Sequence, residues 1–159
     1  KTQRVIRDFT RYLQNNFTAI AEEEAIPFTK ELEHTQAYLA VERACNEGRL
    51  FVEFDTPVTF FRIPPLTLQP IVENAVKHGL DPDSEPLRVS VSTRDTGLGV
   101  EVRVADTGPG YTPPEGGRLG FALDNIRERL KTLCDGTLSI EGKVGDGTLV
   151  TVSVPWKQS

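Results

Sequence analysis

Several residue types and patterns are scarce in this 159-residue sequence, and each scarcity excludes a class of protein. It contains no methionine, one tryptophan and two cysteines. Cys45 and Cys134 are far apart and lack the spacing of metal-binding cysteines, so we expect buried free thiols of a reducing cytosol rather than a disulfide framework or a zinc site. No apolar run approaches the length of a membrane-spanning helix.

Positive charge is also scarce relative to negative charge. The chain has 18 Lys and Arg residues against 23 Asp and Glu residues, a formal net charge of -5. Phosphate backbones require a basic surface, so we expect no nucleic-acid partner. A negative net charge does not exclude a nucleotide as a ligand, because a few suitably placed side chains are enough to bind one. The 38% of hydrophobic residues can build an ordinary buried core.

The first 48 residues carry a helical pattern. Apolar residues recur at helical spacing from Val5 to Ile20, and the next segment interrupts them. Thr29 is the expected N-cap of a second helix, and Gly48 is expected to end it. Glu31 is expected in the first turn, where its negative charge interacts favourably with the positive end of the helix dipole. Because the chain begins within a helical pattern, we interpret it as a fragment of a longer protein.

From Arg49 onward, short alternating strands are separated by helices. The expected strands are Leu50–Phe54, Thr59–Ile63, Leu87–Val91, Val100–Val104, Thr137–Glu141 and Thr148–Pro155, and the expected helices are Leu66–His78 and Leu123–Leu133. A hairpin is expected at residues 97–99. Mostly hairpin-linked strands with helices between them predict an α+β fold, a sheet covered by helices on one face. We divide the chain into a helical segment, residues 1–48, and a domain, residues 49–159.

The helix expected from Leu66 to His78 has two chemically different faces. With Glu73 at zero and roughly 100° per residue, Lys77 falls near ~40°, Asn74 near ~100° and His78 near ~140°, and apolar residues fill the remaining arc. A solvated surface helix would also have a polar face, but Asn is a poor mid-helix residue and therefore indicates a role. An amide oxygen beside a carboxylate suits magnesium, and Lys77 is placed to meet phosphate.

Three glycine-rich segments follow that helix. Asp106–Gly110 comes where a strand ends, and it is either a plain turn or a site at which Asp106 accepts a hydrogen bond from an amine such as that of adenine. Gly116–Gly120 precedes a helix and is either an ordinary loop or a phosphate cradle. A hairpin turn explains Gly145–Gly147, which leaves Thr148 as an extra contact.

These four segments, in this order, resemble the N, G1, G2 and G3 boxes of the Bergerat ATP-binding fold. Histidine kinases share that fold with gyrase, chaperone and mismatch-repair ATPases. The resemblance implies a two-layer α/β sandwich, whose mixed, mostly antiparallel sheet carries helices on one face and is preceded by N-terminal helices. Leu68–Gly79 (LQPIVENAVKHG) is similar to the N box of LytS-like sensor histidine kinases, and Leu123–Leu130 (LDNIRERL) to the helix after their lid. Upstream, Glu31–Glu33, Tyr38-Leu39 and Arg43 resemble the linker between that family's phosphoacceptor helix and its ATP domain.

The resemblance implies a site for ATP and Mg²⁺. Asn74 would be the magnesium ligand and Glu73 the catalytic residue, a general base that polarises the attacking imidazole of a substrate histidine. The other implied ATP-binding residues are Lys77 and His78 at phosphate, Asp106 at the adenine amine, Gly108 and Gly110 along the base, Gly120 at phosphate, and Thr148 near the adenine through water.

Three departures from the family pattern affect these expectations. Thr107 replaces the usual Asn of the G1 box, which should keep the turn, and Ala122 replaces a Gly of the G2 box, which would stiffen the lid or reduce phosphate contacts. The family's phosphoacceptor histidine lies upstream of this chain. His34 lacks the Pro and Phe residues that follow that histidine, so we expect a solvated helix residue and a chain that binds ATP without its own phosphorylation site.

The resemblance therefore implies the ATP-binding catalytic domain of a two-component sensor histidine kinase, which transfers the γ-phosphoryl group of ATP to a histidine outside this chain. The implied partners are that phosphoacceptor histidine of the same parent protein, a response regulator and the second subunit of a homodimer. The domain would be the cytoplasmic part of a bacterial sensor that is anchored in the membrane through N-terminal regions outside this chain.

Two alternatives stay open. One is another ATPase, or a serine kinase, of the same fold. The short lid between Gly110 and Gly120 opposes the large ATPases, and the LDNIRERL helix opposes the serine kinases. The other is a degenerate, non-catalytic nucleotide-binding scaffold, which the intact Glu73, Asn74 and Asp106 oppose.

Overall fold

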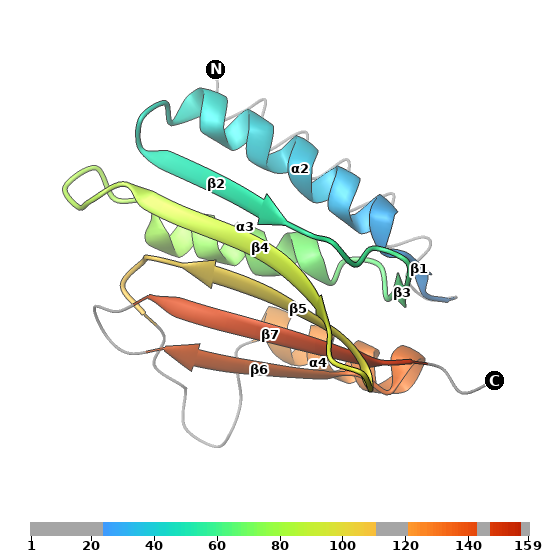
Figure 1. Cartoon of the computed structure of the whole chain (residues 1–159). Helices are drawn as coiled ribbons and strands as arrows, with labels where there is room; N and C mark the ends of the chain where they lie inside the picture. The colour runs from blue at the N-terminus through green and yellow to red at the C-terminus, as the bar shows by residue number, and fades with distance from the viewer. Residues whose placement is uncertain (1–23, 111–120, 143–146, 157–159) are drawn as a thin grey trace.

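The structure, a computed structural model, describes residues 24–110, 121–142 and 147–156 as a sheet with helices packed on it (Figure 1). The strands are β1 (Ile26–Pro27), β2 (Leu50–Asp55), β3 (Arg62–Ile63), β4 (Leu87–Asp95), β5 (Gly99–Asp106), β6 (Thr137–Gly142) and β7 (Thr148–Pro155), and the helices are α2 (Phe28–Cys45), α3 (Leu68–Gly79) and α4 (Phe121–Cys134). The expected helix Val5–Ile20 lies outside these residues. Within these ranges, no helix has the combination of length and apolar sequence that a membrane span requires.

The main sheet has five strands in the order β2-β4-β5-β7-β6. The edge strand β2 runs parallel to β4, with Leu50 opposite Leu87, and every other neighbouring pair is antiparallel. The β4–β5 connection is the expected hairpin: Thr96 N donates to the Gly99 carbonyl at 2.9 Å, and Gly97 has a φ of 88°. The mixed, mostly antiparallel sheet that the family resemblance implies is thereby confirmed.

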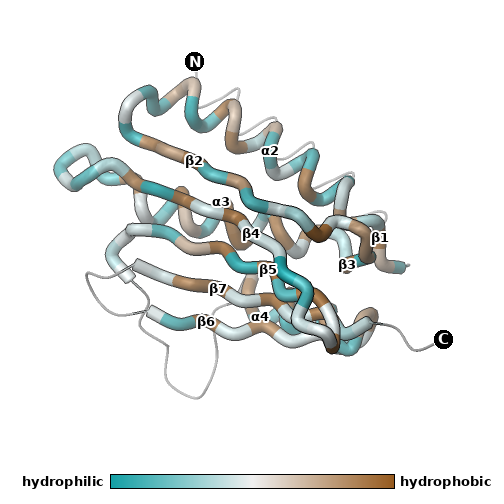
Figure 2. The backbone as a smooth tube through the Cα atoms, in the orientation of Figure 1, coloured by the Kyte–Doolittle hydropathy of each residue, from teal (hydrophilic) through white to brown (hydrophobic). Residues whose placement is uncertain are grey.

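The core lies between the sheet and the helices. Along β4, buried Leu87, Val89 and Val91 alternate with more exposed residues, and a similar alternation of burial follows in β5 and β7. The tube of Figure 2 shows the hydrophobic and hydrophilic residues that follow one another along these strands. Val72 of α3 has no exposed surface. Full burial of one such side chain contributes about 1.5–3 kcal/mol, so these alternating rows hold the helices against one face of the sheet.

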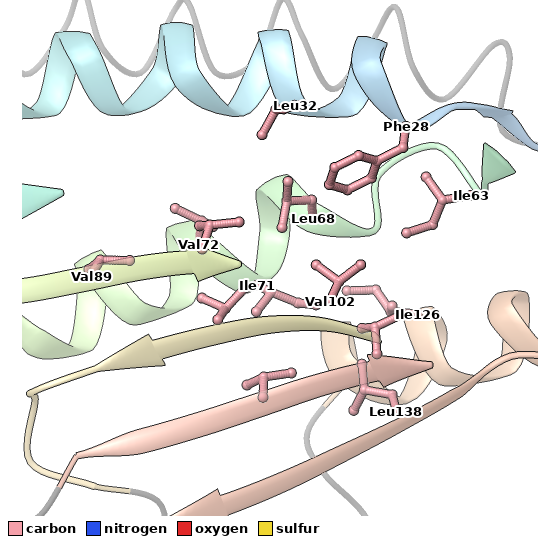
Figure 3. Close-up of a cluster of buried hydrophobic side chains, with 14 of the residues drawn as sticks. Phe28, Leu32, Ile63, Leu68, Ile71, Val72, Val89, Val102, Ile126 and Leu138 are labelled. Carbon is pink, nitrogen blue, oxygen red and sulfur yellow. The ribbon is translucent and has the colours of Figure 1, made fainter. Parts of the chain in front are cut away.

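Helix α2 shares this core rather than standing apart from it. Phe28 and Leu39 are almost completely buried, and Figure 3 shows Phe28 and Leu32 beside Leu68 of α3. Side chains of α2 and of the sheet thus belong to one continuous hydrophobic core. The division of the chain into residues 1–48 and 49–159 stays a prediction.

The ends of α2 differ from those expected. The helix begins at Phe28 with Pro27 at its N-cap and no side-chain capping bond, so the expected cap Thr29 lies inside the first turn and is exposed. The helix ends at Cys45, and Gly48, with a φ of 78°, belongs to the turn that leads into β2. Both cysteines are free, as expected, but only Cys134 is buried, because Cys45 at the end of α2 is half-buried.

The expected strand Thr59–Ile63 is mostly wrong. Residues 62 and 63 alone form a strand, β3, and it pairs with β1 rather than with the main sheet. Phe61 explains the difference: its ring stacks on Phe28 with 4.5 Å between centroids, and its carbonyl accepts from Phe28 N. These two contacts hold the segment around Phe61 against the start of α2 and away from the main sheet. Helix α3 begins at Leu68, later than expected, because Leu66 has a left-handed φ of 59°.

Candidate functional site

Helix α3 separates its side chains as its sequence predicts. The apolar residues of one face are buried: Leu68, Ile71, Val72 and Val76. On the other face Glu73 and Asn74 are half-buried, while Lys77 and His78 are exposed near the C-terminal end. The helix thus offers a carboxylate and an amide at mid-length and two nitrogen-bearing groups one turn later.

The Glu73 carboxylate lies in a partly desolvated place between α3 and α2. Gln69 Nε2, one turn earlier and itself buried, donates to Glu73 Oε1 at 3.1 Å. Burial raises the pKa of Glu73 above the ordinary 4.5, Glu42 of α2 raises it further by charge repulsion, and the Gln69 hydrogen bond opposes both. A carboxylate with a raised pKa is a better proton acceptor near neutral pH.

Tyr38 and Glu42 of α2, with Asn46 at the C-cap of that helix, complete this environment. Tyr38 donates its hydroxyl to Glu42, and Asn46 Nδ2 reaches the same carboxylate at 3.3 Å. Desolvation raises the pKa of Glu42, while those two hydrogen bonds lower it. Burial first, and then the charges of Glu42 and Glu73, also raise the pKa of Tyr38.

The Asp106 carboxylate stands at the end of β5, opposite Thr148 on β7. Its Oδ1 accepts from Gly108 N at 2.8 Å, which is the turn-forming bond of the plain-turn interpretation. Desolvation raises the pKa of Asp106 above 3.8, and the backbone N–H groups of Gly108 and Thr148 lower it. A half-buried carboxylate held by backbone donors is a fixed hydrogen-bond acceptor.

Close backbone approaches join this strand end to α3. A Cβ added to Gly108 would lie 3.2 Å from Gly79 Cα, at the C-terminal end of α3, and 3.0 Å from Asp106 Oδ1. A Cβ on Gly147 would lie 2.1 Å from the Asp106 carbonyl oxygen. Glycine at these positions therefore lets α3, β5 and β7 meet around Asp106 with no side chain between them.

The predicted site residues thus fall into two described groups. Glu73, Asn74, Lys77 and His78 lie on α3, while Asp106, Gly108 and Thr148 gather at the strand ends beside Gly79. Gly110, with a φ of 97°, closes the described part of the G1 segment, and Gly120 lies outside the described residues. Their roles towards ATP stay predictions.

The residues at which the sequence departs from the family pattern are placed as follows. Thr107 keeps the turn attached to β4, because its Oγ1 accepts from Arg88 N at 2.9 Å and its N–H donates to the Arg88 carbonyl. Ala122 is exposed in the first turn of α4. His34 is half-buried rather than fully solvated, and that burial lowers its pKa below 6.5.

Three residues around α3 were not recognised from the sequence as site residues: Glu31, Glu42 and Gln69. Gln69 precedes Glu73 by four positions, a spacing that brings side chains together on a helix and could have revealed the pair. Glu31 and Glu42 belong to another helix, so their proximity depends on packing that no local pattern contains.

A cavity of about 460 Å³ lies on the sheet near the same strand ends. Asp106 and Thr107 line it, but no residue of α3 does. Its wall includes Phe51, whose ring lies 4.8 Å from the guanidinium carbon of Arg88. Because it excludes Glu73 and Asn74, this cavity does not join the two groups of predicted site residues.

Comparison with known proteins adds sequence relatives to this geometry. The family model of histidine kinase-, DNA gyrase B- and HSP90-like ATPases matches residues 65–158. The sensor protein LytS of Bacillus subtilis (strain 168) is 33% identical over 173 residues, covering 99% of this chain and 29% of LytS. The sensor histidine kinase BtsS of Escherichia coli (strain K12) is 33% identical over 137 residues, covering 84% of this chain and 24% of BtsS. The chain thus spans less than a third of either relative.

Solved structures resemble the fold at low identity. The catalytic domain of histidine kinase ThkA aligns with a TM-score of 0.61 and 17% identity, covering 83% of this chain and 95% of that one. The mycobacterial sensor histidine kinase MprB aligns with a TM-score of 0.62 and 16% identity, covering 83% and 96%. These likenesses show the α+β architecture of such catalytic domains.

Proposed function

Because this chain belongs to the family of histidine kinase-, DNA gyrase B- and HSP90-like ATPases, and is an ATP-binding domain of the histidine kinase type, we propose that it binds ATP with magnesium between α3 and the ends of β5 and β7. There it would present the γ-phosphoryl group to a histidine of its parent protein. The lid glycine Gly120 is proposed to complete the phosphate side of the site.

One observation carries this proposal: the N-box helix and the G1 and G3 segments meet around Asp106. Gly108 and Gly147 bring backbone close to Asp106, and Thr148 lies opposite it. The Asp106 carboxylate can accept the exocyclic amine of adenine while its backbone donors keep it in place. Phosphates that extend along α3 from this position would pass the face bearing Asn74 and Lys77.

The residues present fit a magnesium ion that is held mainly by its nucleotide. Asn74 offers an amide oxygen, a hard ligand of the kind magnesium prefers. Among the described residues no group of three or more His, Cys, Asp or Glu side chains gathers as a metal cage. Magnesium usually keeps waters and takes phosphate oxygens beside one or two protein ligands, so a single amide is sufficient. When bound, the ion would neutralise charge on the phosphates.

Phosphoryl transfer requires mainly positioning and charge neutralisation. Glu73, with its raised pKa and its hydrogen bond from Gln69, is proposed to accept a hydrogen bond from the attacking imidazole and so increase the nucleophilicity of the other ring nitrogen. Lys77 and His78 are exposed and free to turn towards phosphate oxygens. The proposed partners of the whole protein are its own phosphoacceptor histidine, a response regulator and a second subunit.

The decisive experiment is calorimetric titration of the chain with a non-hydrolysable ATP analogue, with and without Mg²⁺. We expect binding that magnesium strengthens. Asp106→Asn should weaken binding by about 1.5–3 kcal/mol, roughly tenfold or more, because a charged acceptor is lost. Unchanged affinity would refute the adenine contact.

Asn74→Ala is expected to act differently in the same titration. It should remove most of the magnesium enhancement and leave the magnesium-free affinity nearly intact, because Asn74 is proposed to touch only the ion. Persistence of the full enhancement would show that another residue holds the metal. A folded chain that binds no nucleotide at all would instead favour the non-catalytic scaffold.

A further inference from the structure

Helix α3 begins without a capping side chain of its own. The first backbone N–H groups of a helix have no partner within it. Thr67, at the N-cap, forms no capping bond, because its hydroxyl donates to the Pro64 carbonyl at 2.6 Å. Pro65 and the left-handed Leu66 complete the approach to the helix. The partners of these N–H groups must come from elsewhere.

Glu31 of α2 supplies a partner for the N–H groups of Leu66, of the N-cap Thr67 and of Leu68, the first residue of the helix. Its Oε1 accepts from Thr67 N at 2.8 Å and from Leu68 N at 3.0 Å, and its Oε2 accepts from Leu66 N at 3.2 Å. The side chain is 1% exposed, so this carboxylate belongs to the interior and not to the surface of α2. An acidic group is also stabilised there by the positive end of the α3 dipole.

A third helix contributes to the same cluster. Arg129 of α4 donates through its Nη2 to the Pro65 carbonyl, and its charge acts on Glu31. Desolvation raises the pKa of Glu31, while the three backbone donors and Arg129 lower it. The start of α3 is thus bonded to side chains of both α2 and α4.

The turn that Glu31 caps also contains Gln69. The side chain of Gln69 is 1% exposed, and its Nε2 donates to Glu73 Oε1 at 3.1 Å. The first turn of α3 therefore connects two carboxylates: Glu31 accepts hydrogen bonds from its backbone, and Gln69 in the same turn donates to Glu73. Asn74 is the next residue along the helix.

We propose that Glu31 is a positioning residue: by capping α3 from α2, it fixes the first turn in which Gln69 holds the Glu73 carboxylate, and so sets the polar face of α3. The inference rests on the proposed function for the meaning of that face. Its structural part, the order of the first turn, does not depend on nucleotide.

The test compares Glu31→Gln with Glu33→Gln, the same substitution on the exposed side of α2, and with Leu138→Ala, a core truncation on β6. Glu31→Asp keeps the charge with a shorter reach and serves if Glu31→Gln does not fold. We measure hydrogen exchange of the amides of residues 66–68, the NMR signals of the Gln69 side-chain amide, and affinity for an ATP analogue with and without Mg²⁺.

In Glu31→Gln we expect exchange of those amides to accelerate by about tenfold or more and the Gln69 amide signals to move towards those of a free amide. The magnesium enhancement of affinity should fall by about tenfold while magnesium-free affinity changes little. Glu33→Gln should change none of these quantities. Leu138→Ala should lower stability without shifting the Gln69 signals.

The outcomes separate the two proposals. Faster exchange with unchanged Gln69 signals and unchanged magnesium enhancement would reduce Glu31 to a stabilising cap and overturn its positioning role. If the unsubstituted chain binds no nucleotide, the proposed function fails, while the Gln69 signals still decide whether Glu31 orders the first turn.

Discussion

At the scale of the residue, the neighbours of Glu73 determine the orientation and the pKa of its carboxylate. Gln69 orients one carboxylate oxygen, while burial and Glu42 work against its ionisation. The hydrogen bond from Gln69 fixes this carboxylate as an acceptor, while burial keeps its pKa above the ordinary value.

Glu73→Gln tests the base role directly. Gln keeps the shape and can still meet Gln69, but it lacks the basicity that an attacking imidazole requires. In the parent protein we expect transfer from ATP to the phosphoacceptor histidine to slow by about 10²–10⁴-fold, with ATP affinity nearly unchanged. Single-turnover transfer and calorimetry measure the two quantities. A rate within a few-fold of the unsubstituted protein would remove Glu73 from the chemistry.

Single residues also show the limit of what a sequence pattern predicts. The polar face of Glu73, Asn74, Lys77 and His78 was predictable, because it depends only on helical periodicity. Glu31 was assigned to the positive end of its own helix, whereas its carboxylate caps α3. A local pattern shows which residues share a helix, but it does not show which other helix end lacks a partner.

At the scale of the element, glycines decide how closely α3, β5 and β7 approach. Gly147 has a φ of 85°, and any Cβ there would meet the Asp106 carbonyl oxygen. Gly48 has a similar φ of 78° but no atom within 4 Å of its Cβ position. The two glycines share backbone conformation and differ in the space around them.

This pair gives a matched prediction. Gly48→Ala should lower the free energy of unfolding by about 1 kcal/mol, the strain of a left-handed alanine. Gly147→Ala should lower it by about 3 kcal/mol or more and also weaken ATP binding, because β7 must move away from Asp106. Urea denaturation and nucleotide titration of both variants provide the comparison. Equal losses of stability would mean that the contact with Asp106 is easily relieved.

Elements were predicted well where one pattern controlled them. Alternating apolar and polar residues predicted β4 and β5, and apolar residues at helical spacing predicted α3 and α4. The error at Thr59–Ile63 arose because stacking of Phe61 on Phe28 outweighs strand propensity. The late start of α3 follows from the left-handed Leu66, which the preceding prolines did not reveal.

At the scale of the whole molecule, the fold raises the pKa of four carboxyl groups. Desolvation is the largest cause that raises the pKa of Glu31, Glu42, Glu73 and Asp106 above their ordinary values of 4.5 or 3.8. Each group therefore binds its proton more tightly in the folded than in the unfolded chain. Its contribution to stability is fully present below the unfolded pKa and is lost as the pH rises through the folded pKa.

We therefore expect the free energy of unfolding contributed by these groups to fall as the pH rises from 3.8 for Asp106, or from 4.5 for the three glutamates, through their raised pKa values. Urea denaturation across this range measures it. Glu42→Gln should flatten the dependence, because one group with a raised pKa is gone. A steeper dependence in Glu42→Gln would contradict a raised pKa at that carboxyl group.

The dependence of α3 on α2 also bears on where this domain can be cut. The family match begins at residue 65, yet the carboxylate that caps α3 and the rings of Phe28 and Tyr38 lie well before it. A fragment trimmed to residues 65–158 would expose the apolar flank of α3 and leave its first N–H groups to water. Such a fragment would retain every recognised nucleotide-binding box and still lose the support that holds the first of them in shape.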